Sequence, residues 1–350
     1  MVNSGESFRD DKIMKYAIWN NKGGVGKTFL SFILGTEYAK SNPEKKVILV
    51  DMCPQANLSK IVLGGNGKGG NVLSKILRKN ERKTIGGYFD FRIRIPSNLV
   101  GVESEYLTTV NEFNKELPKN LYLICGDPSL EFQAQVINQI SSQSAPDNIW
   151  RNVRYWLNDL LKSCSTKLGS ELTIIIDCNP SFSSYTEIAL AASDRLIMPC
   201  SSDGSSARAI DNVTGLLYGF NTQKGYKRGS FSVNANDFGM ALPLIHTVIH
   251  NRFTPYAEEA SKSFKAMFGE IKNRVENFKN NCPDKFAGGV ELFSEMPDTH
   301  RVTIACSHKG IPLYKLSAKK YMIHNEYVAV TQEQLDGYRA ATNKLLETIT

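Results

Sequence analysis

Long hydrophobic runs are missing from this sequence. No stretch of about 18 apolar residues occurs, so no transmembrane helix is expected. The amino-terminal segment MVNSGESFRDDKIMKY is polar and lacks the apolar core of a signal peptide. The seven cysteines include no CxxC pair, which argues against a zinc site and against a disulfide framework. We therefore expect a cytoplasmic protein with reduced thiols.

The amounts of apolar and charged residues are ordinary. The chain of 350 residues is 41% hydrophobic and 22% charged, which is typical of a soluble globular protein and allows one large α/β domain or two smaller ones. The formal net charge is +7. This moderate basic excess is compatible with attraction to DNA or to an anionic membrane, and it requires neither.

Apolar runs alternate with helical patterns along the whole chain. The run KKVILVDM, for example, is apolar on both sides and ends in an aspartate, as central strands of parallel sheets do. The alternation predicts an α/β fold with a doubly wound, mostly parallel sheet and helices on both faces. The predicted strands are 15–20, 45–52, 120–125, 172–177, 195–200 and 242–249, and the clearest predicted helices are 28–41, 149–164, 185–192 and 331–349.

A single domain is expected to span residues 13–350, after a flexible tail of residues 1–12. Three segments depart from the regular alternation, and we interpret them as irregular insertions. They lie near 64–98, which is glycine-rich and then basic, near 221–239, and near 261–281, which has the pattern of a charged surface helix.

Residues 22–28, KGGVGKT, lie between a predicted strand and a predicted helix. Glycines there let the backbone turn its N–H groups inward around an anion, and the helix that follows adds the positive end of its dipole. Lys27 can then reach the β- and γ-phosphates of a nucleotide, and the Thr28 hydroxyl can bind Mg²⁺. The loop therefore predicts a nucleotide-binding site formed by Lys22, Gly23, Gly24, Val25, Gly26, Lys27, Thr28 and Phe29.

The pattern K-G-G-x-G-K-[ST] resembles the deviant Walker A box of the ParA/MinD family of P-loop ATPases. The resemblance implies ATP and Mg²⁺ as ligands and a homodimer with ATP sandwiched at its interface. It also implies that Lys22 reaches the nucleotide of the partner subunit, which explains why the loop has a second lysine. A lysine that is not needed within its own subunit is free to neutralise charge in the other.

The segment VILVDMCPQANLS resembles the second motif of that family, with Asp51 at the end of a strand beside the phosphate loop. The resemblance gives Asp51 a catalytic role and a place beside Mg²⁺. The family usually has an aspartate where this chain has Cys53, and a neutral thiol orients a water poorly. We therefore expect slow hydrolysis of ATP to ADP and phosphate, unless another side chain replaces that carboxylate.

Later segments resemble further motifs of the family. LTIIIDCNPS resembles the Walker B strand, which makes Asp177 a third expected Mg²⁺ neighbour besides Thr28 and Asp51. Looser matches imply that Thr247, Pro297 and Asp298 approach the adenine base.

The resemblance implies a protein that positions plasmids, chromosomes or other cargo through nonspecific DNA binding and an adaptor of the ParB kind that stimulates hydrolysis. Localisation would be cytoplasmic, and on the nucleoid when ATP is bound. The last helix is too acidic for a basic membrane-binding helix, so no membrane partner is expected. An alternative is a hydrolysis-impaired, nucleotide-controlled dimer that regulates a partner protein. The candidate DNA contacts are Arg78, Lys79, Arg82 and Lys83, and separately Arg301, Lys309, Lys315, Lys319 and Lys320.

Overall fold

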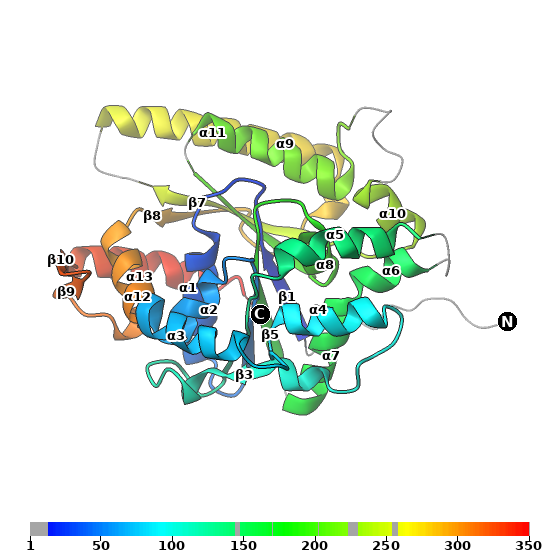
Figure 1. Cartoon of the computed structure of the whole chain (residues 1–350). Helices are drawn as coiled ribbons and strands as arrows, with labels where there is room; N and C mark the ends of the chain where they lie inside the picture. The colour runs from blue at the N-terminus through cyan, green and yellow to red at the C-terminus, as the bar shows by residue number, and fades with distance from the viewer. Residues whose placement is uncertain are drawn as a thin grey trace.

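The computed structural model describes residues 13–143, 148–169, 171–201, 203–222, 230–253 and 258–349, so the expected tail of residues 1–12 lies outside it. At its centre is an eight-stranded sheet in the order β3-β4-β2-β5-β1-β6-β7-β8 (Figure 1). Its strands pair in parallel except β3, which is antiparallel to β4. In chain order these strands are Ile13–Ile18, Lys46–Met52, Leu107–Thr109, Leu121–Ile124, Leu172–Cys178, Arg195–Cys200, Leu244–Phe253 and Phe293–Pro297.

Two apolar cores cover the two faces of the sheet, because successive strand residues point to opposite sides. In β2, for example, Ile48 and Val50 belong to one core, and Val47 and Leu49 belong to the other. One face packs against α1 (Lys27–Ser41), α2 (Asn57–Val62), α3 (Gly65–Leu77), α12 (His300–Lys309) and α13 (Gln332–Leu346). The other packs against α4 (Ile85–Arg94), α5 (Leu130–Ser141), α6 (Ile149–Arg154), α7 (Trp156–Leu168), α8 (Ser184–Ala191), α9 (Gly204–Tyr218), α10 (Phe231–Asp237) and α11 (Glu258–Asn281).

The doubly wound sheet predicted from the sequence is confirmed, and each of the six predicted strands is present. The predicted helix 149–164 is divided into α6 and α7 at Tyr155. Parts of the three irregular segments form helices, namely α3 and α4 in the first, α10 in the second and α11 in the third. The strands β3 and β8 and a small antiparallel hairpin of β9 (Lys320–Ile323) and β10 (Glu326–Ala329) were not predicted. None of the described helices is long and apolar enough to span a membrane.

Candidate nucleotide-binding site

The glycine segment forms a tight loop between β1 and α1. Gly24 and Gly26 have φ angles of 77° and 85°, which side chains with a Cβ rarely adopt. A Cβ on Gly26 would also lie 2.3 Å from Nδ2 of Asn251, so this position has no room for a side chain. Gly26 caps the amino-terminal end of α1, where backbone N–H groups and the helix dipole favour an anion.

Lys27, the first residue of α1, folds back over this loop. Its Nζ donates hydrogen bonds to the carbonyl oxygens of Asn20 at 3.1 Å and Lys22 at 2.6 Å. Burial lowers the pKa of Lys27, because a charged amino group loses hydration there. Since loop carbonyls are its only acceptors among the described residues, the amino group is placed to bind an anionic oxygen above the loop.

Asp177 ends β5 beside the loop, and one of its oxygens is unpaired. Ser31 Oγ donates to Oδ1 at 3.3 Å, and the Thr28 hydroxyl also bonds this carboxylate. Among the described residues, the buried Oδ2 has no hydrogen-bond partner. Burial and then the nearby Asp51 raise the pKa of Asp177, because a second negative charge in the same dry site is unfavourable. A carboxylate oxygen without a partner beside a threonine hydroxyl fits a hydrated Mg²⁺, which would also relieve that repulsion.

Asp51 of β2 lies directly opposite Asp177 of the neighbouring strand β5. Both carboxylates therefore lie at the same end of the sheet, as expected from their two motifs. Its oxygens, however, accept hydrogen bonds from the loop that follows and from the first turn of α2. Oδ1 accepts from the Cys53 backbone N–H at 3.1 Å, and Oδ2 accepts from the backbone and the hydroxyl of Ser59, both at 2.8 Å. The contact of Asp51 with Mg²⁺ stays a prediction; in this structure the carboxylate ties the Cys53 backbone to the first turn of α2.

Cys53 lies between the two aspartates and the segment after β5. Burial, followed by the charges of Asp51 and Asp177, raises the pKa of its thiol to about 12. The thiol is therefore neutral near pH 7. Asn179 Nδ2 donates to Cys53 Sγ at 3.8 Å, while Asn179 Oδ1 accepts from Ser181. A neutral thiol thus stands at this position, in contact with the Asn179 side-chain amide and the Gln55 backbone.

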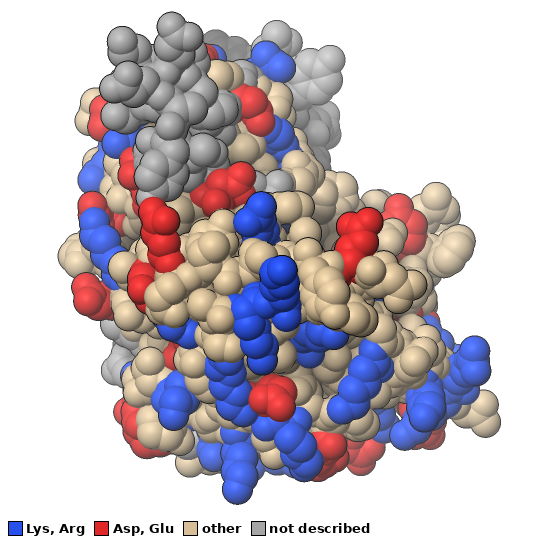
Figure 2. All heavy atoms as spheres, turned by 90° about the vertical axis from the view of Figure 1, so that its left-hand side faces the viewer, with Lys and Arg blue, Asp and Glu red and all other residues tan. Residues whose placement is uncertain are grey.

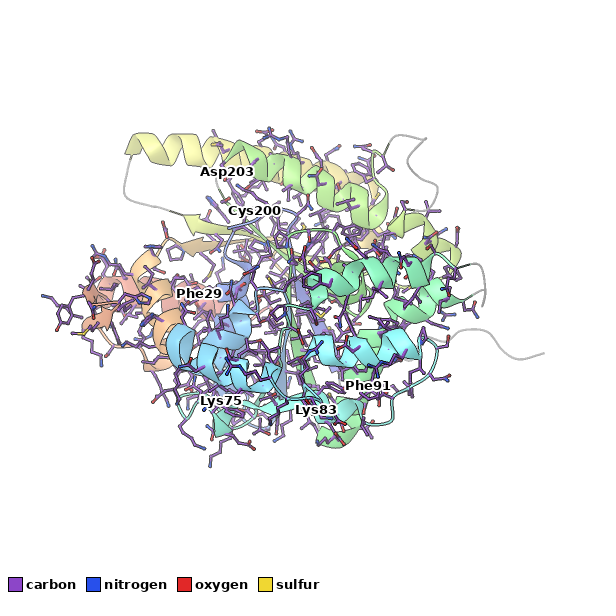
Figure 3. All side chains as sticks on the ribbon, viewed as in Figure 1. Phe29, Lys75, Lys83, Phe91, Cys200 and Asp203 are labelled. Atoms are coloured by element: carbon purple, nitrogen blue, oxygen red, sulfur yellow. The ribbon has the colours of Figure 1, made fainter. Side chains whose placement is uncertain are left out.

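Lys22 points away from Lys27 and binds the start of α9. Its Nζ forms an ion pair with Asp203 and donates to Ser201 Oγ at 3.0 Å and Ser206 Oγ at 3.2 Å. Partial burial would raise the pKa of Asp203, but hydrogen bonds from Lys22, Ser205 and Ser201 lower it well below its ordinary value. Figure 3 labels Asp203, the partner of Lys22, and Phe29, which lies on α1.

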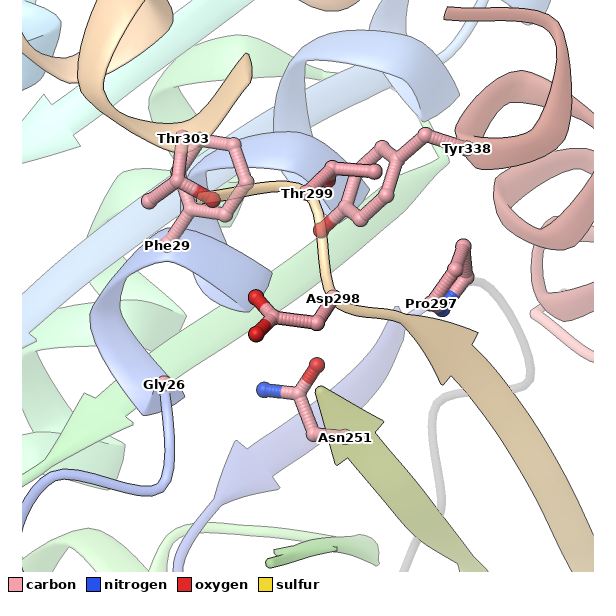
Figure 4. A pocket seen from close by; sticks show the side chains of 8 residues that line it. All are labelled: Gly26, Phe29, Asn251, Pro297, Asp298, Thr299, Thr303 and Tyr338. Atoms are coloured by element: carbon pink, nitrogen blue, oxygen red, sulfur yellow. The ribbon is translucent and has the colours of Figure 1, made fainter. Parts of the chain in front are cut away.

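A small pocket opens beside the loop (Figure 4). Its volume is about 20 Å³, room for about one water, so a purine base would enter only if side chains move. The hydroxyl of Thr299 is buried there and has no partner among the described residues, which leaves it free for a ligand. The lining residues are Gly26, Phe29, Asn251, Pro297, Asp298, Thr299, Thr303 and Tyr338.

The structure brings Phe29, Pro297 and Asp298 together as expected, but not Thr247. That residue is fully buried between β7 and β8, and its hydroxyl donates to the Leu292 carbonyl at 3.2 Å. Sequence reasoning missed Asn251 and Tyr338. Asn251 Nδ2 donates to the Val25 carbonyl at 2.8 Å and so joins β7 to the phosphate loop. The position of Asn251 just after the apolar run of β7 could have indicated a residue at the site. No sequence pattern singled out Tyr338 in the last helix.

The two predicted basic clusters differ in charge balance. In the first, Arg82 pairs with Asp90 and Asp127, and Lys83 pairs with Glu105. Half of that cluster is thus neutralised. In the second, Lys315 pairs with Glu116, and the described residues provide no carboxylate partner for Arg301, Lys309, Lys319 and Lys320.

Comparisons with known proteins agree with this site. A family model described as an AAA domain matches residues 13–224. The chromosome partitioning protein ParA of Caulobacter vibrioides is 27% identical over 254 residues, which are 73% of this chain and 76% of that protein. Apo McdA of Cyanothece has a TM-score of 0.60 at 18% identity, with 94% of this chain and 99% of the other covered.

A further solved structure is a putative plasmid partition protein from Borrelia burgdorferi B31 bound to AMPPNP. It has a TM-score of 0.52 at 18% identity, with 96% of this chain and 99% of the other covered. At such identities these two structures support the fold. The family match extends over more than half of the chain and includes the phosphate loop and Asp177. The chain therefore belongs to this AAA domain family and is a ParA/MinD-like P-loop ATPase.

Proposed function

We propose that this protein binds MgATP, dimerises around two ATP molecules, and positions DNA or other cargo through nonspecific DNA binding and an adaptor that stimulates hydrolysis. The observation that carries the proposal is the division of labour in one loop. Lys27 is held over the anion-binding turn, whereas Lys22 points away from it toward α9. Lys27 is thus placed for its own nucleotide, and Lys22, once released from Asp203, would be free to reach the nucleotide of a second subunit.

Each part of the nucleotide has residues that suit it. The backbone N–H groups of the loop and Lys27 would hold the phosphates. Thr28 and the unpaired oxygen of Asp177 would hold Mg²⁺, whose charge neutralises the phosphates when bound, and Asp51 would keep the adjoining loop in place. The base would lie against Phe29, Asn251, Pro297, Asp298, Thr299 and Tyr338, and we leave Thr247 out of this set.

Hydrolysis at this site would be slow, because the residues near the place expected for the attacking water are weak bases. The neutral Cys53 thiol accepts a proton poorly, and the Asn179 amide orients a water without taking its proton. The absence of one water-orienting base would lower the rate by a factor of about 10² to 10⁴. The ATP-bound dimer would then persist in the cytoplasm. It would stay on the nucleoid until an adaptor of the ParB kind accelerates ATP hydrolysis.

The neutral thiol of Cys53 also favours a second candidate function. This is a nucleotide-controlled dimer that holds or regulates a partner protein without useful hydrolysis. The two functions differ in one measurement. Phosphate release that rises when DNA and the cognate adaptor are added supports the positioning ATPase. Release that stays at the basal rate with both present supports the binding module.

Lys22→Ala tests the dimer. We expect the variant to bind MgATP with nearly the affinity of the unchanged protein, because Lys27 and the loop amides remain, but to elute as a monomer in size-exclusion chromatography with MgATP. Lys40→Ala, which removes an exposed lysine from the last turn of α1, is the control and should still dimerise. If Lys22→Ala dimerised as well as the control, the role across the interface would be refuted.

A further inference from the structure

A second concave surface lies far from the nucleotide site. It is a groove of about 520 Å³ between the end of α1, the start of β2, the loop before β4 and the segment after α12. Twelve residues line it, and none of them is an aspartate or a glutamate. Five lysines from these four segments meet there, namely Lys40, Lys46, Lys115, Lys119 and Lys315.

Hydrogen bonds fix the walls of this groove. The buried Asn120 donates through Nδ2 to the carbonyl oxygens of Ala39, Asn42 and Lys45, at 2.9 to 3.0 Å, and so ties the turn between α1 and β2 to the start of β4. On the other wall, the Tyr314 hydroxyl donates to the Glu116 carbonyl at 3.1 Å. The lysines therefore project from a prebuilt surface, and the ordering cost of binding falls mainly on their own side chains.

Most of this positive charge is not balanced within the protein. Lys315 pairs with Glu116 at 3.1 Å. In the ranges that the structure describes, Lys40, Lys46, Lys115 and Lys119 have no carboxylate partner, although Lys40 lies over the Tyr314 ring. The helix dipole accounts for a lysine in the last turn of α1, but not for four more converging from other segments. A concave surface lined by one sign of charge concentrates its field on an oppositely charged ligand.

The groove lies at the amino-terminal ends of the strands, and the nucleotide site lies at their carboxyl-terminal ends. Lys46 begins β2, and Asp51 lies five residues further on at its other end, which is a separation of about 17 Å along the strand. A dimer built on the nucleotide edge therefore leaves the groove open. Figure 2, which faces α12, α13 and the β9–β10 hairpin, shows lysine and arginine gathered over the lower part of this side.

We propose that this groove binds the phosphate backbone of duplex DNA, without sequence preference; the choice of ligand rests on the proposed function. Lysine ammonium groups suit phosphates, and the convex ridge of a sugar-phosphate backbone suits a groove. Lys315 is also part of the second predicted basic cluster, so a duplex could continue from the groove toward Lys319 and Lys320. A membrane surface fits less well, because none of the exposed large hydrophobic residues of the described chain lines the groove.

The position of the groove explains how ATP could control retention on DNA without changing the groove. Each protomer has a complete groove, and an ATP-bound dimer has two on one particle. Two grooves that bind one long duplex gain avidity of the order of 10²-fold or more. We therefore expect MgATP to tighten binding to a long duplex strongly and binding to a duplex too short to reach both grooves hardly at all. Equal tightening on both duplexes would overturn this model of control.

The double variant K115E/K119E tests the site itself. Both residues are exposed, and neither contacts the nucleotide site. With fluorescence anisotropy on a random-sequence duplex in MgATP, we expect at least about tenfold weaker binding near 0.1 M salt, and a slope of log K against log salt that is less steep by about 2. The neutral K115Q/K119Q should weaken binding by less, but it should change the slope by about as much, because it loses the same two phosphate contacts.

The control is K162E/K167E, which makes the same change of charge on α7, on the opposite face of the sheet. It should bind DNA within about twofold of the unchanged protein, and both double variants should retain ATP binding and dimerisation. If the unchanged protein binds DNA and K115E/K119E binds equally well, the groove proposal is wrong while the proposed function stands. If the unchanged protein binds no DNA with or without MgATP, the DNA-binding function fails first. Groove-dependent binding to phosphatidylserine vesicles in place of DNA would refute the assigned ligand.

Discussion

At the scale of single residues, we expect Cys53 to limit the rate at which the proposed site hydrolyses ATP. A carboxylate there would lie beside Asp51 and Asp177, in contact range of the Asn179 amide, and could accept the proton of a water that the thiol cannot. We expect Cys53→Asp to raise the rate of phosphate release at saturating MgATP by about 10²-fold.

Cys53→Asn is the matched control, because it has a similar size and accepts a hydrogen bond but no proton. It should remain within a few-fold of the unchanged protein. ATP affinity must be measured for both variants, since a third carboxylate near Asp51 and Asp177 opposes an anionic ligand. If the Cys53→Asp variant binds ATP normally but hydrolyses it no faster, the thiol does not limit the rate of hydrolysis.

At the scale of elements, the start of α9 holds Lys22 within its own subunit. Asp203 accepts from the backbone N–H groups of Ser205 and Ser206 through Oδ1 and pairs with Lys22 through Oδ2. One side chain thus caps the helix and retains the lysine that the proposed dimer needs. Formation of the proposed dimer would break this contact, so the contact would oppose association.

Asp203→Asn separates the two roles, because asparagine caps helices about as well as aspartate but has no charge. Exposed ion pairs contribute about 0.2 to 1 kcal/mol each, and the proposed dimer would break one in each protomer, so we expect dimerisation in MgATP about two- to thirtyfold tighter, measured by analytical ultracentrifugation. Asp203→Ala also loses the cap and should lower the melting temperature, which Asp203→Asn should not. A weaker dimer for Asp203→Asn would mean that Asp203 acts in the dimer itself.

The predictable elements were those with a strong local pattern. The sequence was enough to assign β2 and β5 from their apolar runs, and the phosphate loop before α1 from its glycines. Strands β3 and β8 did not, because β3 has three residues and β8 is only partly buried at the sheet edge. The pocket beside the phosphate loop combines α1, β7, β8, α12 and α13, and such long-range packing leaves no local pattern. Asn251 and Tyr338 could therefore be placed only by the structure.

At the scale of the whole molecule, the sheet separates two tasks. Its carboxyl edge carries the phosphate loop, Asp177 and Lys22, and its opposite edge carries the lysine groove. Because the strands between them are buried on both faces, the two sites are joined by rigid structure. We therefore expect nucleotide binding to act on DNA through the number of grooves in the particle rather than through a change in each groove.

His246 reports on the integrity of this whole structure, because it joins the two ends of the described chain. On β7, its ring meets Tyr16 of β1 edge-on at 5.2 Å, and its Nε2 lies 3.2 Å from the Thr348 hydroxyl beyond α13. Burial, and then the positive charge of Arg195, lowers its pKa to about 4. The folded state therefore excludes a proton that the unfolded chain accepts below its ordinary pKa of about 6.5.

The sign of the pH effect follows from that difference. Between the two pKa values the unfolded state binds more protons, so stability falls as the pH falls from about 6.5 toward 4. At pH 5.5 the loss from His246 alone is about 1 kcal/mol relative to pH 7.5. Glu37, whose buried carboxyl has its pKa raised to about 7, changes stability in the opposite direction, so the comparison must be made against a variant.

His246→Gln keeps a side-chain amide near Thr348 and removes the titration. In urea unfolding at both pH values, we expect the free energy of unfolding to fall about 1 kcal/mol less for this variant than for the unchanged protein between pH 7.5 and 5.5. Any constant cost of the substitution cancels in this difference. Equal losses for the two proteins would mean that His246 takes up its proton in the folded state, and that the contact between β1, β7 and the end of α13 is open to water.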